Sequence, residues 1–182
     1  MKEVLVLVGS PRKKGNSDIM ADTFIQGAEM RGHLATKIYV TDFKVAGCLG
    51  CDKCWVDGTH CVQKDEMSNI YPALEKSSVL VFSTPLYCFS WPAQIKSVID
   101  RIYTYVSPNR KASLGIKESV LLAVAATGNA TDFDGLLYSY NLNNKYHNWK
   151  DCGTLLATGV NEKGAVCAEN WLERARIMGM EI

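Results

Sequence analysis

The sequence predicts a doubly wound α/β fold, in which helices cover both faces of a five-stranded parallel sheet in a single domain, residues 1–182. Short apolar runs that suit buried strands alternate with segments of helical periodicity. The length is close to that of one domain, and no internal repeat or long linker divides the chain. The strands are expected at residues 4–8, 35–40, 78–83, 119–127 and 152–160.

The first strand and helix have the clearest pattern. Residues 4–8, VLVLV, form a continuous apolar run that ends before Gly9, which is typical of a strand buried on both faces of a parallel sheet. Ser17 offers a cap for the helix that follows, and Gly32 offers a stop. The apolar residues of this helix recur at i, i+3, i+4 and i+7: Ala21, Phe24, Ile25 and Ala28.

Three further helices are expected. One spans about residues 68–76, and a second is capped by Ser90 with Pro92 in its first turn. The last ends before Gly179 and is expected to bury Ala168, Trp171, Leu172 and Ala175. Residues 131–150, rich in Asn and Tyr, are compatible with a pocket wall, a subunit interface or a plain surface helix.

The composition narrows the class of partner. A formal net charge of +1 gives no long-range field that would attract nucleic acid or an anionic membrane. The longest apolar run, residues 120–126, is too short to span a bilayer, and the N-terminus lacks a secretory signal. We therefore expect a cytoplasmic protein, in which closely spaced cysteines more often indicate metal or redox chemistry than structural disulfides.

The loop after the first strand, GSPRKKGNS at residues 9–17, is suited to bind an anion. It lies where open α/β sheets bind ligands, and it leads into a helix N-terminus with free backbone N–H groups and a favourable dipole. Ser10, Asn16 and Ser17 add short donors, and Arg12 adds a charged fork. The spacing fits neither a dinucleotide fingerprint nor a P-loop. A terminal monophosphate is the expected guest, and a solvated basic turn is the alternative.

This loop, together with STPLYCFSWPAQIKSVIDR at residues 83–101, resembles the flavodoxin-like NAD(P)H:FMN oxidoreductase family. The resemblance implies the strand order 2-1-3-4-5, FMN as cofactor and NAD(P)H as co-substrate. It implies a phosphate-binding set of Ser10, Arg12, Lys13, Gly15, Asn16 and Ser17. The isoalloxazine would lie against Pro85, Leu86, Tyr87, Cys88 and Phe89, with a third contact region at Thr127, Gly128 and Asn129. The alternative for the second loop is that its aromatic residues only pack beneath it.

Four cysteines lie close together in a cysteine-rich loop, residues 41–66. Cys48, Cys51, Cys54 and Cys61 are spaced C-x2-C-x2-C-x6-C, which lets three thiolates converge on one centre. The detached fourth cysteine distinguishes the motif from that of a bacterial ferredoxin. The spacing leaves open an iron–sulfur cluster, thiols without a metal, a zinc site and a regulatory disulfide. His60, beside the last cysteine, is expected to be a solvated loop residue.

The compact motif is similar to that of the iron–sulfur flavoproteins, a branch of the same family. This resemblance implies that Cys48, Cys51, Cys54 and Cys61 hold a [4Fe–4S] cluster. It also implies a homodimer or homotetramer, which would bring one subunit's cluster near another's flavin.

The expected function is that of an FMN-dependent oxidoreductase that transfers electrons between NAD(P)H or ferredoxin and a small-molecule acceptor. No catalytic side chain is assigned, because a flavin carries the chemistry and the protein supplies position and polarity. Three alternatives stay open: an FMN or quinone reductase without a cluster, a flavodoxin-like electron carrier, and a cysteine-based sensor that binds no flavin. The net charge of +1 does not favour the carrier, which needs an acidic docking surface.

Overall fold

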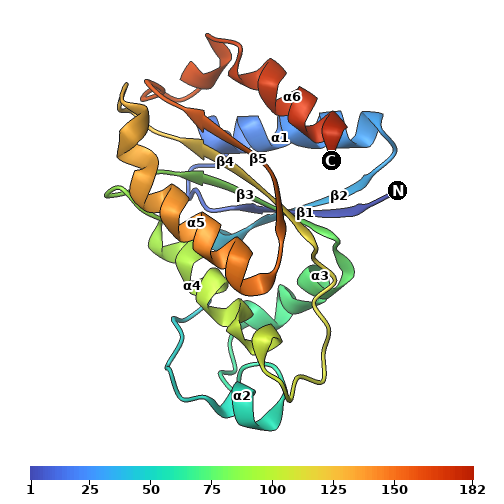
Figure 1. The fold of residues 1–182 in the computed structure, drawn as a ribbon. Coiled ribbons are helices and arrows are strands. Elements are labelled where there is room, and N and C mark those ends of the chain that lie inside the picture. Colours follow the sequence, from blue (N-terminus) through green and yellow to red (C-terminus); the bar gives the residue numbers. More distant parts are fainter.

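The computed structural model describes all residues 1–182 and contains a five-stranded parallel sheet in the order β2-β1-β3-β4-β5 (Figure 1). This confirms the fold class and strand order expected from the sequence. The winding direction reverses between β1 and β3, so the loops that follow these two strands diverge and leave a crevice at the carboxyl edge. The strands are β1 (Glu3–Val8), β2 (Leu34–Tyr39), β3 (Val79–Pro85), β4 (Glu118–Val124) and β5 (Lys150–Ala157).

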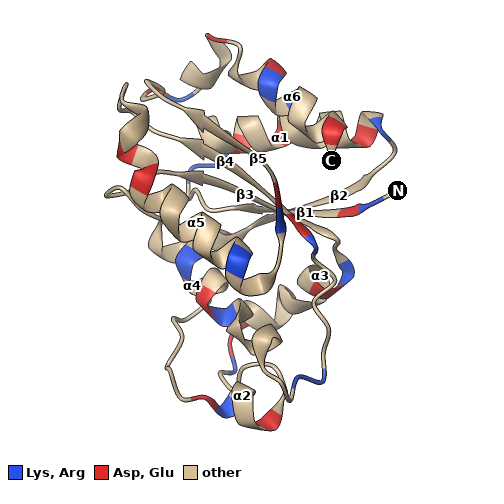
Figure 2. Cartoon of the chain, viewed as in Figure 1, with Lys and Arg blue, Asp and Glu red and all other residues tan.

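Helices cover both faces of the sheet (Figure 1). On one face lie α1 (Asn16–Met30) and α6 (Trp171–Glu181), and on the other lie α3 (Tyr71–Lys76), α4 (Ala93–Arg101) and α5 (Asp134–His147). Charged residues concentrate on the helices, the loops and the ends of strands (Figure 2). None of the helices has the length and apolar character that crossing a membrane requires.

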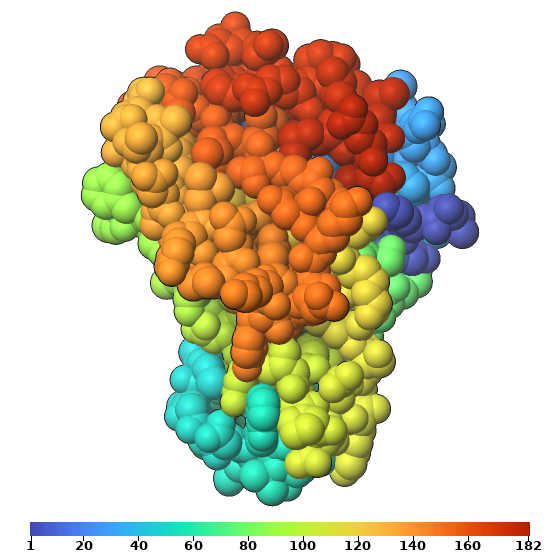
Figure 3. Space-filling model, in the orientation of Figure 1, coloured from blue at the N-terminus to red at the C-terminus, as the bar shows by residue number.

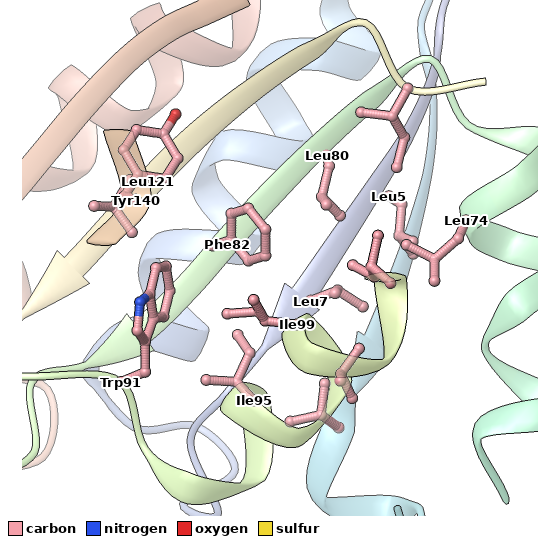
Figure 4. Close-up of a cluster of buried hydrophobic side chains, with 14 of the residues drawn as sticks. Leu5, Leu7, Leu74, Leu80, Phe82, Trp91, Ile95, Ile99, Leu121 and Tyr140 are labelled. Atoms are coloured by element: carbon pink, nitrogen blue, oxygen red, sulfur yellow. The ribbon is translucent and has the colours of Figure 1, made fainter. Parts of the chain in front are cut away.

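The central strands separate two hydrophobic cores. In β1, Val4, Val6 and Val8 pack on the side of α1 and α6, whereas Leu5 and Leu7 pack on the side of α4. All five are almost completely buried, which is why the run reads as continuously apolar. Figure 4 shows the second core, where side chains of β1, β3 and β4 face those of α3, α4 and α5. Each buried leucine there stabilises the fold by about 2 kcal/mol.

Several expected boundaries were wrong. The expected helix at residues 68–76 is divided into a 3-10 turn (Glu66–Asn69) and α3, because Pro72 lacks an N–H and suits only the first turn of a helix. Ser17 and Ser90 are not helix caps, since Gly15 and Pro92 hold those positions.

The last two strands end earlier than expected, at Val124 and Ala157, where the chain turns into the loops of the carboxyl edge. In the last helix region, Ala175 is buried as expected, but Ala168 is exposed. Residues 134–147 form α5, whose Tyr138 and Tyr146 side chains are exposed.

The cysteine-rich loop contains the short helix α2 (Lys53–Asp57) and projects from the body of the molecule together with residues 102–115 (Figure 3). The two segments are joined by backbone and side-chain hydrogen bonds. The Thr104 hydroxyl donates to the carbonyl of Thr59 at 2.7 Å, and the Ser107 hydroxyl donates to the carbonyl of Trp55 at 2.8 Å. The Trp55 ring also stacks on Tyr103 with centroids 5.2 Å apart. The projection is therefore a folded part of the protein.

Helices α1 and α6 cross so closely that a Cβ atom at Gly27 would overlap the backbone carbonyl of Arg176. We expect Gly27→Ala to lower the free energy of unfolding by about 1–3 kcal/mol, because overpacking against backbone outweighs the helix propensity of alanine. Denaturant titration measures the change. Gly47→Ala, at a site with open space around it, is the control and should be neutral; equal stabilities of the two variants would contradict the prediction.

Candidate functional site

A cleft of about 240 Å³ opens at the carboxyl edge of the sheet. It is formed by the loops that follow β1, β3, β4 and β5, as the crevice rule for open α/β sheets predicts. Its lining residues are Ser10, Arg12, Gly15, Asn16, Ser17, Pro85, Leu86, Tyr87, Val124, Ala125, Ala126, Val160, Asn161 and Lys163.

One end of the cleft is suited to an anion. The backbone N–H groups of Asn16, Ser17 and Asp18 begin α1 and have no acceptor within the helix. Ser10 is buried, and its oxygen accepts the N–H of Arg12 at 3.1 Å, which leaves its hydroxyl proton free to donate. The Arg12 side chain is exposed and forms no ion pair. Unpaired positive charge and free donors therefore meet at the helix N-terminus.

The Asn16 side chain does not serve as a donor to the cleft. Its amide nitrogen donates to the carbonyls of Val160 at 3.1 Å and Glu162 at 2.8 Å. Its oxygen accepts the N–H groups of Gly164 at 2.8 Å and Val166 at 3.3 Å. These four bonds use the full hydrogen-bonding capacity of the amide. Asn16 thus ties the first loop to the loop after β5, and only its backbone N–H remains for a ligand.

The buried carboxylate of Asp18 supports the loop from within the protein. It accepts the N–H of Lys14 at 2.7 Å, the hydroxyl of Tyr39 at 2.9 Å and the ammonium of Lys37 at 2.9 Å. Burial alone would raise the pKa of Asp18, but these bonds outweigh it and hold the pKa below its usual value. Because Lys37 compensates its charge, Asp18 does not oppose an anion at the start of α1.

The other end of the cleft is more apolar, since it is lined by Pro85, Leu86 and residues 124–126. The Leu86 N–H donates to the carbonyl of Val124 at 2.8 Å, which joins the loops after β3 and β4. Tyr87 and Ser90 exchange two backbone hydrogen bonds, at 3.1 and 3.0 Å, and so close a tight turn. Cys88 and Phe89 occupy its tip with positive φ angles of 45° and 62°. This end offers apolar surface and fixed backbone rather than charge.

The cleft brings together eight of the residues expected to bind a cofactor, and six lie outside its lining. Lys13 is paired with Asp42 at 2.8 Å. The Thr127 hydroxyl donates to Asp132 at 2.5 Å, and the Asn129 oxygen accepts the N–H of Thr131. Cys88 is exposed. The residues outside the lining are Lys13, Cys88, Phe89, Thr127, Gly128 and Asn129.

Sequence reasoning missed the contribution of the loop after β5. Val160, Asn161 and Lys163 line the cleft, and Lys163 places a second exposed cation near Arg12. The sequence contains a signal for this contribution. The loop follows the carboxyl end of a strand and contains two glycines, Gly159 and Gly164, both of which adopt positive φ.

The four cysteines of the cysteine-rich loop lie near one another. Cys48 and Cys51 are exposed, and Cys54 and Cys61 are half-buried. Burial raises the pKa of the Cys54 thiol, and the nearby Cys61, Cys48 and Cys51 raise it further. No three cysteine, histidine or acidic side chains of the structure are close enough to share a metal ion. The donor chemistry fits a soft metal centre, and the loop would have to close further for the sulfurs to converge.

His60 is not the solvated residue that the sequence suggested. Its ring stacks on Tyr71 with centroids 4.2 Å apart, and its Nε2 lies 2.6 Å from the Glu75 carboxylate. The Tyr105 hydroxyl donates to the same carboxylate at 2.8 Å. These contacts fix the last cysteine of the motif against α3.

Residues 2–133 match the sequence profile of NADPH-dependent FMN reductases. The chain belongs to this FMN reductase family. The matched region contains the loops after β1 and β3 and the whole cysteine-rich loop, which confirms the family resemblance stated from the motifs.

Relatives of the chain include iron–sulfur flavoproteins. One from Archaeoglobus fulgidus is 36% identical over 105 residues, which cover 58% of this chain and 47% of the relative. Another from Methanosarcina thermophila is 28% identical over 120 residues, covering 66% of this chain and 60% of the relative. The chain thus spans about half to three fifths of the length of these curated relatives.

Solved structures confirm the fold. An NAD(P)H:quinone oxidoreductase from Methanothermobacter marburgensis superposes with a TM-score of 0.75 at 19% identity, covering 98% of this chain and 96% of that one. An FMN-dependent NADH-azoreductase from Bacillus anthracis, solved in complex with FMN, has a TM-score of 0.69 at 14% identity, covering 98% of both chains.

We expect Asn16→Ala to lower the free energy of unfolding of this FMN reductase family member by about 3 kcal/mol, because it leaves two N–H groups and the carbonyl of Val160 without partners. Asn161→Ala is the matched control, since Asn161 also lines the cleft but is exposed and bonds only to Glu162 at 3.3 Å. It should change the stability by less than about 0.5 kcal/mol. Thermal unfolding compares the two variants. A small loss of stability in Asn16→Ala would refute the role of the Asn16 side chain in joining the first loop to the loop after β5.

Proposed function

We propose that the chain is an FMN-dependent oxidoreductase that transfers electrons between NAD(P)H or ferredoxin and a small-molecule acceptor. The observation that carries the proposal is the division of the cleft into two chemically distinct ends. One end offers free helix N–H groups and two unpaired cations, and the other offers apolar side chains and a hydrogen-bonded backbone turn. A flavin mononucleotide has the same division, with a phosphate at one end and an aromatic ring at the other.

In this proposal Ser10, Ser17 and Arg12 hold the FMN phosphate together with the first N–H groups of α1. Lys163 supplies the second cation from across the cleft, which matches the double charge of a phosphate near neutral pH. Pro85, Leu86 and Tyr87 lie along the ring, with residues 124–126 beside it. Cys88 and Phe89 form the exposed rim, from which they can contact a ring or its reaction partner.

When bound, FMN supplies the redox chemistry, and the chain supplies position and access. Asp18 and Asn16 hold the first loop in place through the hydrogen bonds described above. The only ionisable side chains in the lining are Arg12, Tyr87 and Lys163, so the cleft has no carboxylate or histidine to act as a general base. In this proposal the residues of the cleft thus bind and orient the flavin rather than transfer protons.

The phosphate assignment predicts a difference between two flavins. Arg12→Ala and Lys163→Ala should each weaken FMN binding about tenfold or more, because each removes a charge-assisted hydrogen bond. Neither should change the affinity for riboflavin, which lacks the phosphate. Flavin fluorescence titration measures both affinities.

Lys13→Ala is the matched control, since this neighbouring lysine is paired with Asp42 and lies outside the cleft lining. It should leave both affinities unchanged. Equal losses for FMN and riboflavin in the Arg12 and Lys163 variants would show that the phosphate is not at this end. Failure of the purified protein to bind FMN or to oxidise NADPH with FMN present would overturn the proposal itself.

We further propose that Cys48, Cys51, Cys54 and Cys61 hold a [4Fe–4S] cluster. Support comes from their compact spacing, their mutual proximity in a folded projection, and the relatives that are named iron–sulfur flavoproteins. Such a cluster would supply one-electron chemistry. Helix α4, about 13 Å long, extends from the flavin loop to the cysteine-rich loop, so a homodimer or homotetramer would help by placing one subunit's loop near another's cleft.

The cluster proposal predicts separable colours. A Cys51→Ser and Cys54→Ser double variant, purified without oxygen, should lose the brown absorption and the bound iron. It should retain yellow FMN, because no residue of the cysteine-rich loop lines the cleft. Cys167→Ser, which removes an exposed cysteine outside the loop, should retain both. Loss of FMN from the double variant would instead indicate that the loop only supports the cleft.

A second candidate is an NAD(P)H-dependent FMN or quinone reductase without a cluster. The observation in its favour is that the four sulfurs do not converge in this structure. A wild-type protein that binds FMN and oxidises NADPH but takes up no iron or sulfide would select this candidate. A protein that binds FMN but never oxidises NADPH would select an electron carrier.

A further inference from the structure

A second cavity, of about 290 Å³, lies between the projection and the end of α5 (Figure 1). Its walls come from the segments that precede β4 and β5, whereas the cleft is formed by loops that follow these strands. No residue lines both the cavity and the cleft. The volume is close to the lower end of the range for small-molecule sites, about 300 Å³. A ligand of this cavity would therefore be separate from a flavin in the cleft.

Two cations line the cavity without an acidic partner. Arg110 comes from the projection and Lys117 from the body of the molecule, and both side chains are exposed. The Arg110 guanidinium donates only to the carbonyl of Ser107, at 3.2 Å, and no aspartate or glutamate is present in the lining. The positive charge of the cavity is thus not compensated by the protein.

The charge is a local feature of the sequence. The chain has 20 basic and 19 acidic residues, yet segments 102–117 and 135–150, which contain all of the lining residues, have no acidic residue. The acidic residues that follow these segments are engaged elsewhere. Glu118 pairs with Lys2 at 2.5 Å, and Asp151 accepts the hydroxyl of Tyr140 at 2.9 Å. The cavity is therefore suited to a negatively charged ligand.

Further donors of the lining also have no partner in the protein. The hydroxyl of Ser113 and the side-chain amide of Asn148 form no hydrogen bond. The indole N–H of Trp149 has no acceptor either, although this residue is only 7% exposed. A donor on so buried a side chain normally has a partner, and the cavity is the place where one can bind. Neutral and charged donors thus converge on one space that contains no charged acceptor.

Aromatic rings form the wall on the side of α5. The His147 ring stacks on Trp149 with centroids 4.5 Å apart, and Tyr146 meets His147 edge-on at 5.4 Å. Burial lowers the pKa of His147 to about 4, so the imidazole is neutral near pH 7. Tyr146 is exposed and leaves a ring available for contact. This wall offers aromatic surface next to the two cations.

We propose that the cavity is a second ligand site, which binds a small organic anion with a planar ring and joins the projection to the body of the molecule. Arg110 and Lys117 hold the anionic group from the two sides, and the aromatic wall contacts the ring. A phosphate and a carboxylate satisfy the same donors, so both belong to the ligand class. The Lys111 N–H donates to the carbonyl of Gly58 at 2.7 Å, so a ligand here also steadies the cysteine-rich loop.

Calorimetric titration of the full chain with AMP and with benzoate tests the site. We expect at least one of these probes to bind; tighter binding of AMP identifies a phosphate as the anionic group, and tighter binding of benzoate identifies a carboxylate. The neutral analogues, adenosine and benzamide, should bind about tenfold more weakly or worse, because they lack the group that the cations hold. Absence of binding by both anions, or equal affinity for an anion and its neutral analogue, would overturn the inference.

Arg110→Ala and Lys117→Ala should each weaken binding of the anion about tenfold, because each removes a charge-assisted hydrogen bond. Both side chains are exposed, so the variants should fold as the wild type does. Lys111→Ala is the matched control, since this exposed lysine adjoins Arg110 but lies outside the lining. It should leave the affinity unchanged. An equal loss in the Lys111 variant would show that general positive charge attracts the anion and would refute a built site.

Arg12→Ala separates this site from the cleft, where the phosphate of AMP could also bind. The affinity for AMP should not change in this variant. A loss of AMP binding in Arg12→Ala but not in the Arg110 and Lys117 variants would place the anion in the cleft and overturn the inference. Failure of the protein to bind FMN would refute the proposed function alone, because the two sites share no residue.

Limited digestion with trypsin tests whether the ligand joins the two parts. Cleavage after Lys111 requires this segment to open locally, and a ligand that binds both walls opposes the opening. A saturating concentration of the anion that binds should therefore slow this cleavage, as followed by mass spectrometry. Cleavage after Lys14, in the loop after β1, is the internal control and should keep its rate. An unchanged rate after Lys111 would overturn the joining role.

Discussion

The four hydrogen bonds of the Asn16 side chain are the constraint on which the cleft depends. They join the start of α1 to a loop some 150 positions later in the chain, so the first and last loops of the carboxyl edge are held at one separation. The free N–H groups of α1 and the two cations that face them keep their arrangement only while this connection holds. A side-chain amide is suited to this task because it can donate two hydrogen bonds and accept two.

Helix α4 is the structural link between the two chemical regions of the molecule. It begins just after the turn that forms the apolar end of the cleft, and it ends at Arg101, which binds both ends of the cysteine-rich loop. Its inner face is anchored in the core by Ile95 and Ile99 (Figure 4) and by Val98. The spacing between the two regions is thereby fixed by a rigid element rather than by flexible linkers.

The fold and much of the cleft could be predicted because their signals are local. Buried parallel strands read as continuous apolar runs, and the loop after β1 carries its own donors and helix start. The role of Asn16 could not be predicted, since its partners are backbone groups that are distant in sequence. Every residue carries such groups, so the residue types at those positions do not reveal the contact. The same holds for Lys163 and for the contacts of His60. Spacing located the cysteines in one loop, but it did not determine how closely their sulfurs approach.

The turn at Cys88 and Phe89 has a consequence for the evolution of this protein. Two residues other than glycine hold left-handed backbone conformations there, each at a cost of about 1 kcal/mol. Glycine at either position would relieve the cost, but it would also free the rim of the cleft to sample other shapes. The chain thus gives up some folding stability to keep a thiol and an aromatic ring in a defined place at the entrance of the cleft. Selection for thermal stability alone would not maintain these two strained residues.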